Sequence, residues 1–357
     1  MKYRVQNTFK QSKNILTDST DTKHSHQTTA NITTKVSALA AAFLTVDEAS
    51  EGQRVDNYLT KTLKGVPKSH VYRILRSGEV RVNKKRIEAD FRLSLGDIVR
   101  IPPTQSTATD KPVSTTPQTP KFDGVIVYED EALLVLDKPA GIAVHGGSGV
   151  SRGVIEQLRL ERPKAKFLEL VHRLDRETSG ILMVAKKRTA LVALHQAIRN
   201  NQTDKRYLML VKGTWLEAKK RVILDLQKYL LPNGERRVNV VTDKSKDKYD
   251  ERQSSETLFR LVKNFQSSIG EFSLLEAQLV TGRTHQLRVQ LSHLGFPILG
   301  DDKYGDFAHN KVLQKQGLKR MFLHSAETKI KHPLTKEKLI LKAALPAELA
   351  RFLQKLE

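Results

Sequence analysis

The chain has 357 residues, of which 39% are apolar and 28% are charged. This length favours two domains, or one large domain with an appendage. No apolar run approaches the roughly 20 residues that span a bilayer, so a membrane-spanning role is not expected. The net charge of +22 suits a polyanionic partner, and nucleic acid is the leading candidate. The absence of cysteine excludes disulfides, thiolate nucleophiles and Cys-ligated metal centres.

The N-terminal segment is polar. Residues 1–43 are rich in Ser, Thr, Asn, Gln and Lys, a composition that predicts a disordered tail. No continuous apolar run follows Lys2 and Arg4, so a secretory signal is not supported and a cytoplasmic protein is expected. A membrane surface would also attract positive charge, but the basic residues are spread through segments with folded patterns and do not form one amphipathic helix.

Residues 44–103 are predicted to form a small basic domain. Ser69 is expected to cap a helix that places its apolar side chains on one side and Arg73 and Arg76 on another. Residues 80–83 alternate as a half-buried strand does, and a basic run follows. An isolated run of this kind is usually a solvated face, but the excess of positive charge across the chain favours nucleic acid.

This small domain resembles the S4 RNA-binding domain through residues 52–59, 77–83 and 96–97. The resemblance covers nearly the whole unit and implies a structured RNA as the ligand, recognised by shape and backbone charge. It also implies which helix and strand contact the RNA. The predicted contacts are Arg73, Arg76, Arg81, Lys84, Lys85 and Arg86.

A second domain is predicted after residues 104–121, which are rich in Thr, Pro, Ser and Gln and indicate a flexible linker. Residues 122–357 alternate strand-like runs, such as 133–136 and 181–184, with helix-like segments, such as 189–200. We therefore expect a mixed α+β domain. No nucleotide-binding glycine loop or internal repeat indicates another architecture.

The densest polar cluster of this domain lies in residues 169–180, where an apolar run precedes His172, Arg173, Asp175 and Arg176. Gly180 then lets the chain turn into the next apolar run. Catalytic groups favour such loops. The residues alone leave two interpretations open, because a carboxylate between arginines also forms structural ion-pair networks.

Residues 172–180 resemble the signature of the pseudouridine synthases that modify large-subunit ribosomal and transfer RNA, the RluA family. Residues 137–147, 205–207 and 281–288 resemble further segments of this family in the same order. The resemblance runs from about residue 45 to the C-terminus. It implies an α+β chain in which a small S4-like domain and a linker precede a catalytic domain with a mixed, largely antiparallel sheet.

The resemblance implies that Asp175 is the essential carboxylate. It would act as a nucleophile on the sugar or the base, or remove a sugar proton to give a glycal-like intermediate, and the sequence does not choose between these routes. Each route needs an ionised carboxylate, which a neighbouring guanidinium favours. The family match assigns that guanidinium to Arg283. Tyr207 matches the tyrosine that stacks on the uracil and is a candidate to handle the C5 proton, although a packing role is also open.

Two further matches concern the substrate nucleotide. Arg173 matches the arginine that fills the space left by the flipped nucleotide, and flipping is required because a stacked base cannot rotate. Leu287 would pack against the base or Tyr207 and exclude water. Gln290 departs from the histidine that many family members carry after this motif, which puts any role of that side chain in doubt.

No metal or cofactor is expected. His145, His172, His195, His285, His293 and His324 include no pair with the spacing of a helical metal-ligand motif. The reaction is an isomerisation without redox chemistry or energy input.

More than one interpretation of the whole chain is open. Within the family, the resemblance points to members that modify uridines of large-subunit (23S) ribosomal RNA, either as free RNA or in assembly intermediates. Sister enzymes with other target uridines in that RNA stay open. A non-catalytic RNA-binding or ribosome-assembly protein would explain the charge but not four ordered motifs. A uridine C5 methyltransferase would ordinarily use a cysteine nucleophile, which this chain lacks. No heptad or large apolar patch signals an oligomer, so we expect a monomer.

Overall fold

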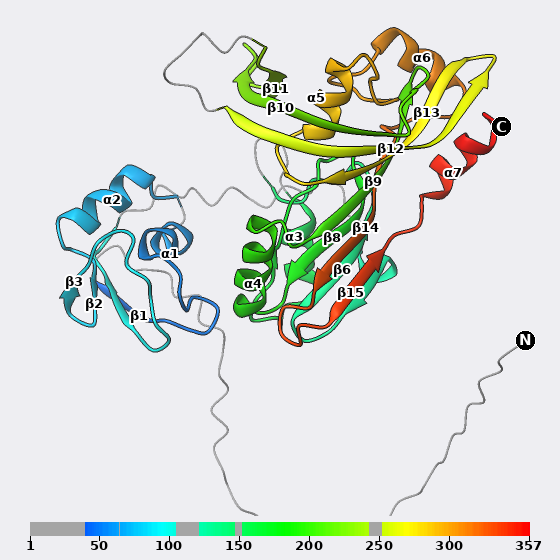
Figure 1. Cartoon of the computed structure of the whole chain (residues 1–357). Helices are drawn as coiled ribbons and strands as arrows, with labels where there is room; N and C mark the ends of the chain where they lie inside the picture. The colour runs from blue at the N-terminus through cyan, green and yellow to red at the C-terminus, as the bar shows by residue number, and fades with distance from the viewer. Residues whose placement is uncertain (1–39, 64, 105–120, 147–151, 243–251) are drawn as a thin grey trace, which may run out of the picture.

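The computed structural model describes residues 40–63, 65–104, 121–146, 152–242 and 252–357. These residues form two units, a small one before the predicted linker and a large one after it (Figure 1). The predicted disordered tail and linker fall almost entirely outside the described residues. The first strand begins at Ala42, so the boundary expected at residue 44 lies inside a strand.

The small unit is an antiparallel sheet with two helices. Its strand order is β1-β4-β2-β3, and a single hydrophobic core lies between the sheet and both helices. Its strands are β1 (Ala42–Thr45), β2 (Arg81–Val82), β3 (Lys85–Arg86) and β4 (Ile98–Ile101), and its helices are α1 (Val55–Thr62) and α2 (Lys68–Arg76).

Helix α2 has the predicted faces but not the predicted cap. Val71 and Ile74 are buried, and Arg73 and Arg76 are exposed, as the helical spacing predicts. The helix begins at Lys68 with the extended Pro67 as its N-cap residue, so Ser69 lies inside the first turn and its expected capping role is wrong. Pro67 has no side-chain hydrogen-bond acceptor, and no side-chain cap is present at this end of the helix.

The large unit is built on one 11-stranded sheet with the path β11-β10-β12-β13-β9-β14-β8-β6-β5, to which β15 adds beside β14 and β7 beside β8. Every pairing is antiparallel except β14 with β8. The strands are β5 (Ile126–Glu129), β6 (Leu133–Lys138), β7 (Glu169–Leu170), β8 (Ser179–Ala185), β9 (Asp204–Lys212), β10 (Lys219–Leu230), β11 (Arg236–Val240), β12 (Gln253–Ser267), β13 (Gly270–Leu279), β14 (Leu323–Lys331) and β15 (Lys338–Lys342).

Short helices accompany this sheet. Helix α4 packs against β8, and α5 packs against β10 and β11 (Figure 1). The predicted strands at 133–136 and 181–184 and the predicted helix at 189–200 are confirmed as β6, β8 and α4. The helices are α3 (Val154–Glu161), α4 (Arg188–Arg199), α5 (Gln286–His293), α6 (Phe307–Lys315) and α7 (Ala347–Gln354), and a 3-10 turn, η1, spans Asp123–Val125.

Gly180 shows why the polar loop ends where it does. It has a φ of +107°, and a Cβ there would lie 2.2 Å from the carbonyl oxygen of Ser325 on β14. Only glycine allows this close approach, through which β8 pairs in parallel with β14. The pairing anchors the loop of residues 171–178 at the centre of the sheet.

The two units touch through polar contacts. Lys61 Nζ on α1 lies 3.3 Å from Glu169 Oε1 on β7, and Arg188 on α4 donates a hydrogen bond to the carbonyl of Glu51. Exposed ion pairs of this kind contribute little to stability, typically up to about 1 kcal/mol.

None of the helices in the described ranges has the length and apolar character of a membrane span.

Candidate active site

A cavity of about 590 Å³ opens beside the polar loop. Its walls come mainly from four parts of the sequence: residues 171–175 of the loop, residues 195–201 at the end of α4, the start of β9, and residues 279–288 at the end of β13 and the start of α5. The first, third and fourth of these parts carry three of the four predicted motifs. The fold therefore assembles them around one space large enough for a nucleotide.

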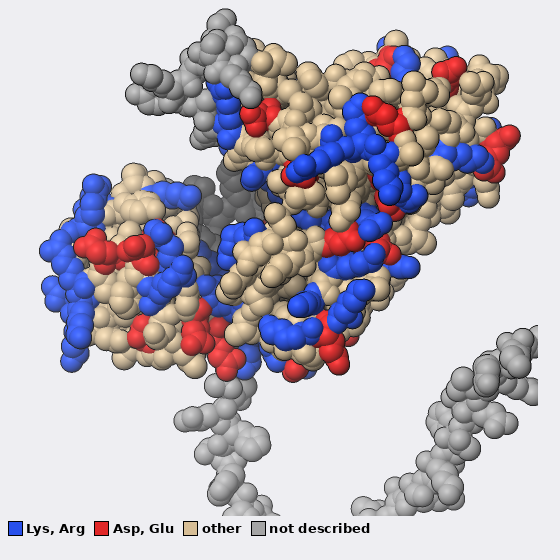
Figure 2. Space-filling view, in the orientation of Figure 1, with Lys and Arg blue, Asp and Glu red and all other residues tan. Residues whose placement is uncertain are grey.

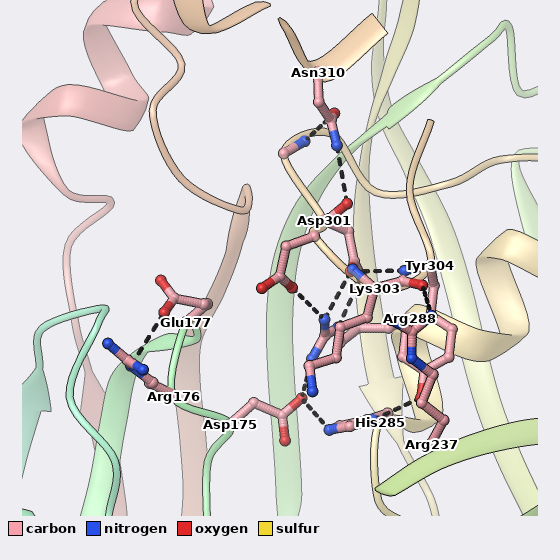
Figure 3. Close-up of polar contacts among 12 residues, drawn as sticks. Asp175, Arg176, Glu177, Arg237, His285, Arg288, Asp301, Lys303, Tyr304 and Asn310 are labelled. Carbon is pink, nitrogen blue, oxygen red and sulfur yellow. Dashed lines mark hydrogen bonds and ion pairs between the residues drawn. The ribbon is translucent and has the colours of Figure 1, made fainter. Parts of the chain in front are cut away.

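Asp175 and Arg288 form the central ion pair of this cavity. Arg288 Nη1 lies 3.2 Å from Asp175 Oδ2, and only 3% of the arginine side chain is exposed, against 18% for the aspartate (Figure 3). The other side of the guanidinium makes two 2.7 Å hydrogen bonds to the buried Asp301. This bidentate contact fixes the plane of the arginine and hence the position of Asp175.

The arginine that contacts Asp175 is therefore not the predicted one. Arg283 is exposed, and its Nε donates a 3.0 Å hydrogen bond to the carbonyl of Ser254 on β12. The expected pairing of Arg283 with Asp175 is wrong in this structure. The reason is local: α5 begins at Gln286, so Arg288 lies in its first turn facing the core, whereas Arg283 lies in the loop before it.

Charge and burial act in opposite directions on this network. Burial alone would lower the pKa of Arg288, but hydrogen bonds and charge from Asp301, together with Asp175, raise it above its ordinary value. Burial likewise raises the pKa of Asp301, and Arg288 more than offsets it, so the pKa is lowered. Both partners stay charged at neutral pH.

His285 contacts Asp175 from a second direction. Its Nε2 lies 3.9 Å from Asp175 Oδ2, and its Nδ1 lies 2.8 Å from the hydroxyl of Tyr304 (Figure 3). That hydroxyl oxygen accepts a 3.0 Å hydrogen bond from the backbone N–H of Val238 on β11. The hydroxyl can therefore donate its own proton to Nδ1, and in that tautomer the histidine proton is on Nε2, facing Asp175.

The backbone of His285 has an unusual conformation. Its φ of +52° lies in the left-handed region, which is unusual for a residue with a side chain, and it directly precedes α5. Burial lowers the pKa of His285, although the charge of Asp175 opposes the shift. The ring is therefore neutral at neutral pH.

Tyr207 and Leu287 line the cavity as predicted. Tyr207 is buried on β9, and burial raises its pKa to about 12, so its hydroxyl stays protonated. Leu287 is buried on α5, and both side chains belong to the same hydrophobic cluster. Packing and cavity lining are thus compatible for Tyr207: one side of the residue is core, and the other borders the cavity.

Arg173 and His172 are neighbours with opposite environments. Arg173 is exposed at the cavity wall and makes no hydrogen bond or ion pair within the described part of the chain. His172 Nε2 accepts a 3.2 Å hydrogen bond from the backbone N–H of Met183 on β8. Burial lowers the pKa of His172 to about 4. The neutral histidine thus holds the loop on the sheet, while Arg173 is free to meet a ligand.

Gln290, which departs from the family pattern, lies outside the cavity lining. It is fully buried on α5, where its Oε1 accepts a 2.7 Å hydrogen bond from Thr257 and its Nε2 donates a 3.0 Å hydrogen bond to the hydroxyl of Ser255. Its role here is to join α5 to β12.

Sequence reasoning missed Arg288, His285, Asp301 and Tyr304 as members of the site. Arg288 and His285 belong to the motif at 281–288, where the sequence gives the residue types but not the direction in which each side chain points. Asp301 and Tyr304 follow Gly300 in a short acidic segment, Gly-Asp-Asp-Lys-Tyr, that was not singled out. A cluster of carboxylates after a glycine was the available signal.

The six basic residues predicted to contact RNA share one exposed surface of the small unit, which we call the basic face. They lie on α2, β2 and β3 and in the turn between the two strands, where Lys84 has a φ of +67°. Arg86 donates a hydrogen bond to the carbonyl of Arg76, which joins β3 to the end of α2. Lys and Arg side chains gather along the outer side of this unit (Figure 2). Exposed positive charge gathered in this way suits a phosphate backbone.

Among the described residues, no group of three or more His, Asp and Glu side chains is arranged to hold a metal ion. The histidines in the cavity serve other contacts: His172 bonds a backbone amide, and His195 Nε2 lies 3.0 Å from the carbonyl of Val171.

Comparison with known proteins agrees with this architecture. The model described as RNA pseudouridylate synthase matches residues 132–293, and the S4 domain model matches residues 53–99. The chain is 48% identical over 321 residues to ribosomal large subunit pseudouridine synthase C of Pasteurella multocida (strain Pm70), covering 89% of this chain and 95% of that relative. It is 48% identical over 328 residues to the protein of the same name from Escherichia coli (strain K12), covering 90% and 98%.

A solved structure shares the fold. Human RNA pseudouridylate synthase domain containing 4 aligns with a TM-score of 0.53 at 24% identity, covering 66% of this chain and 94% of that chain.

The S4 domain and the basic cavity together define a protein that acts on RNA. The chain belongs to the RNA pseudouridylate synthase family, with an S4 domain before its catalytic domain. It is a pseudouridine synthase, an isomerase that converts uridine to pseudouridine.

Proposed function

We propose that this enzyme isomerises specific uridines of large-subunit ribosomal RNA, with Asp175 as its essential carboxylate. The observation that supports the substrate most directly is the 48% identity, over about nine tenths of the chain, to relatives named for the large ribosomal subunit. The basic face of the S4 domain supports a structured RNA. Free ribosomal RNA and its assembly intermediates both fit this proposal, as does a monomeric enzyme.

The proposed reaction begins when the target nucleotide leaves its stack. Arg173, exposed and without a partner among the described residues, would occupy the space that the nucleotide leaves. Unstacking costs a few kcal/mol, which contacts between the protein and the RNA must supply. The uridine then enters the cavity beside Tyr207, whose ring would stack on the uracil, while Leu287 excludes water.

Asp175 acts next in the proposal. The N1 bond to the sugar breaks, the uracil rotates, and C5 bonds to the same sugar carbon. The carboxylate serves either as a nucleophile or as the base that removes a sugar proton, and both routes use its charged form. Arg288 supports that form at 3.2 Å. In the rearrangement C5 loses its proton and N1 gains one, so the isomerisation is balanced without any cofactor.

The test is to map pseudouridines in ribosomal RNA from cells that lack this protein and from the same cells carrying the wild type, Asp175→Asn or Asp90→Asn. Asp90 is an exposed residue of the small domain and provides a matched control. We expect the wild type and Asp90→Asn to restore the same sites in large-subunit RNA. We expect Asp175→Asn to restore none while binding RNA normally, because only the chemical step needs the carboxylate. Restored sites with Asp175→Asn would disprove the proposed role of this residue.

A further inference from the structure

Lys205 is a buried cation without a counter-charge in the part of the chain that the structure describes. It lies on β9 two residues before Tyr207, so both side chains are on the same face of the strand and both line the cavity. Only 8% of Lys205 is exposed. Within the described ranges, its ammonium group makes no hydrogen bond or ion pair. Burial lowers its pKa, and no carboxylate offsets this shift.

The next residue on β9, Arg206, does have acidic partners. Arg206, on the opposite face of the strand, binds Asp204 and Glu276 with N to O distances of 3.1 and 3.2 Å. Lys329 adds a 3.6 Å contact to Asp204 on that side. The fold therefore neutralises the cations on one face of β9 and leaves the cation on the cavity face unpaired.

The surroundings of Lys205 are also positive. Its Nζ lies next to Gly282, where a Cβ would be 3.6 Å away, and Gly282 is part of the cavity wall. Arg173, Arg199 and Arg283 line the same cavity. Asp175 is the only acidic residue of the described lining, and Arg288 already pairs with it. The positive charge of Lys205 also reaches His172, where it adds to the effect of burial in lowering the pKa.

An ammonium group buried without a partner is costly, and such groups are usually paired. The arrangement makes sense when the missing partner is an anion of the ligand. A uracil carbonyl carries no net charge and would leave the cluster positive. A phosphate group carries a full negative charge, and lysine binds phosphate as a point charge.

We propose that Lys205, with Arg199 and Arg283, forms a subsite for one phosphodiester group next to the flipped uridine. The inference rests on the proposed function, since the ligand is the RNA substrate of the same cavity. Two residues of strand separate Lys205 from Tyr207, which is about 6.6 Å. A nucleotide whose base lies against Tyr207 can therefore extend its backbone to Lys205. The subsite would hold the nucleotide in the cavity while its base rotates.

The experiment uses the full-length enzyme and an RNA fragment containing a uridine that mapping shows it to modify. The phosphodiester on the 5′ or the 3′ side of that uridine is replaced by a neutral methylphosphonate. Wild type, Lys205→Met and Lys205→Arg are compared by KM and kcat. With the wild type, we expect one of the two neutral linkages to raise KM by about 10- to 100-fold, the usual effect of losing a hydrogen bond to a charged group.

The decisive result is how the two changes combine. Lys205→Met should raise KM on native RNA by a similar factor, and the same neutral linkage should then add little. Lys205→Arg should recover part of the loss. If the effects of Lys205→Met and of the neutral linkage on KM multiply fully for both linkages, the proposal is overturned. If Lys205→Met lowers only kcat, the proposal is also overturned, because that result would indicate contact with the base.

A second variant keeps the proposal testable if Lys205→Met does not fold. Arg199 is exposed on the last turn of α4, so Arg199→Gln should fold normally and show the same coupling in weaker form. If mapping finds the modified uridine outside large-subunit RNA, the proposed substrate is wrong, but the phosphate test applies unchanged to that RNA. If the site is in large-subunit RNA and neither variant shows coupling, only the subsite is disproved.

Discussion

The S4 domain and the catalytic cavity use arginine in opposite ways. On the basic face, Arg73 and Arg81 are exposed, and the contacts they make are weak: Arg73 lies 3.7 Å from the exposed Glu79, and Arg81 donates to a backbone carbonyl at 3.3 Å. In the cavity, Arg288 is buried and bound to three aspartates, Asp301 at 2.7 Å and Asp175 and Asp302 at 3.2 Å. The first arrangement leaves positive charge available for a ligand. In the second arrangement, carboxylates of the protein itself neutralise the positive charge.

This difference separates affinity from chemistry. Exposed cations attract phosphate over distance, and salt weakens that attraction. A buried guanidinium is already neutralised and instead orients the carboxylate that it contacts. Lys205 combines features of both cases: it is buried like Arg288, and among the described residues its charge has no acidic partner.

The largest expected effect comes from breaking the buried network. Arg288→Gln leaves Asp301 buried without a counter-charge, and we expect a loss of about 3–5 kcal/mol in the free energy of unfolding. In Arg288→Lys, which keeps the charge but not the bidentate geometry, we expect kcat to fall by about 10²- to 10³-fold. Urea unfolding and single-turnover kinetics measure the two effects.

Arg283→Gln is the matched control from the same motif. Because Arg283 is exposed and does not contact Asp175, its replacement should leave stability within about 0.5 kcal/mol and act on KM more than on kcat. A larger fall in kcat for Arg283→Gln than for Arg288→Lys would show that the pairing seen here is not the one used in catalysis.

The next effect tests the basic face. Replacing Arg73, Arg76 and Arg81 together by Gln should weaken RNA binding by about 10- to 30-fold and reduce the slope of log affinity against log salt by about 2–3. Once RNA is saturating, kcat should hardly change. The control replaces the exposed Lys311, Lys315 and Lys319 near α6, which alters net charge equally. Equal losses in both variants would mean that general charge, not the basic face, binds the RNA.

A smaller effect is expected from Tyr304→Phe. When the hydroxyl donates to Nδ1 of His285 it favours the tautomer with the proton on Nε2, so its loss should lower the population of that tautomer and weaken the contact toward Asp175. We expect kcat to fall about tenfold, the scale of one lost hydrogen bond to a charged group, with KM unchanged. Nitrogen NMR of labelled histidine reports the tautomer directly, and an unchanged tautomer in the variant would refute this account of Tyr304.

The smallest effect at neutral pH concerns stability. The pKa of His172 is about 4 in the folded protein, below the ordinary value of 6.5, so the unfolded chain binds the proton more readily. Stability from this group is therefore complete above pH 6.5 and is lost as pH falls toward 4. Between pH 7.5 and pH 5 the loss should be about 2 kcal/mol. His172→Gln should unfold with a correspondingly weaker pH dependence in urea titrations, and an identical dependence would contradict the assignment.

Much of the site was predictable because its chemistry is concentrated in short motifs. The loop around Asp175, the strand with Tyr207 and the segment with Leu287 were predicted from local sequence, and all three border the cavity. The choice between Arg283 and Arg288 was not predictable. Both stand in one motif, and only the start of α5 decides which of them faces Asp175, 113 residues earlier in the chain.

The sequence by itself indicated the two-domain plan, the basic residues of the small domain and Asp175 as the candidate carboxylate, since composition, turn signals and motifs are local properties. The tertiary structure decided the partners. It brought Arg288 and His285 to Asp175 and placed Asp301 and Tyr304 behind them. It also turned Lys205 toward the cavity while the acids near β9 bound Arg206. Strand alternation and helix starts set where each side chain points, and which distant group it meets depends on sheet pairing across the whole domain.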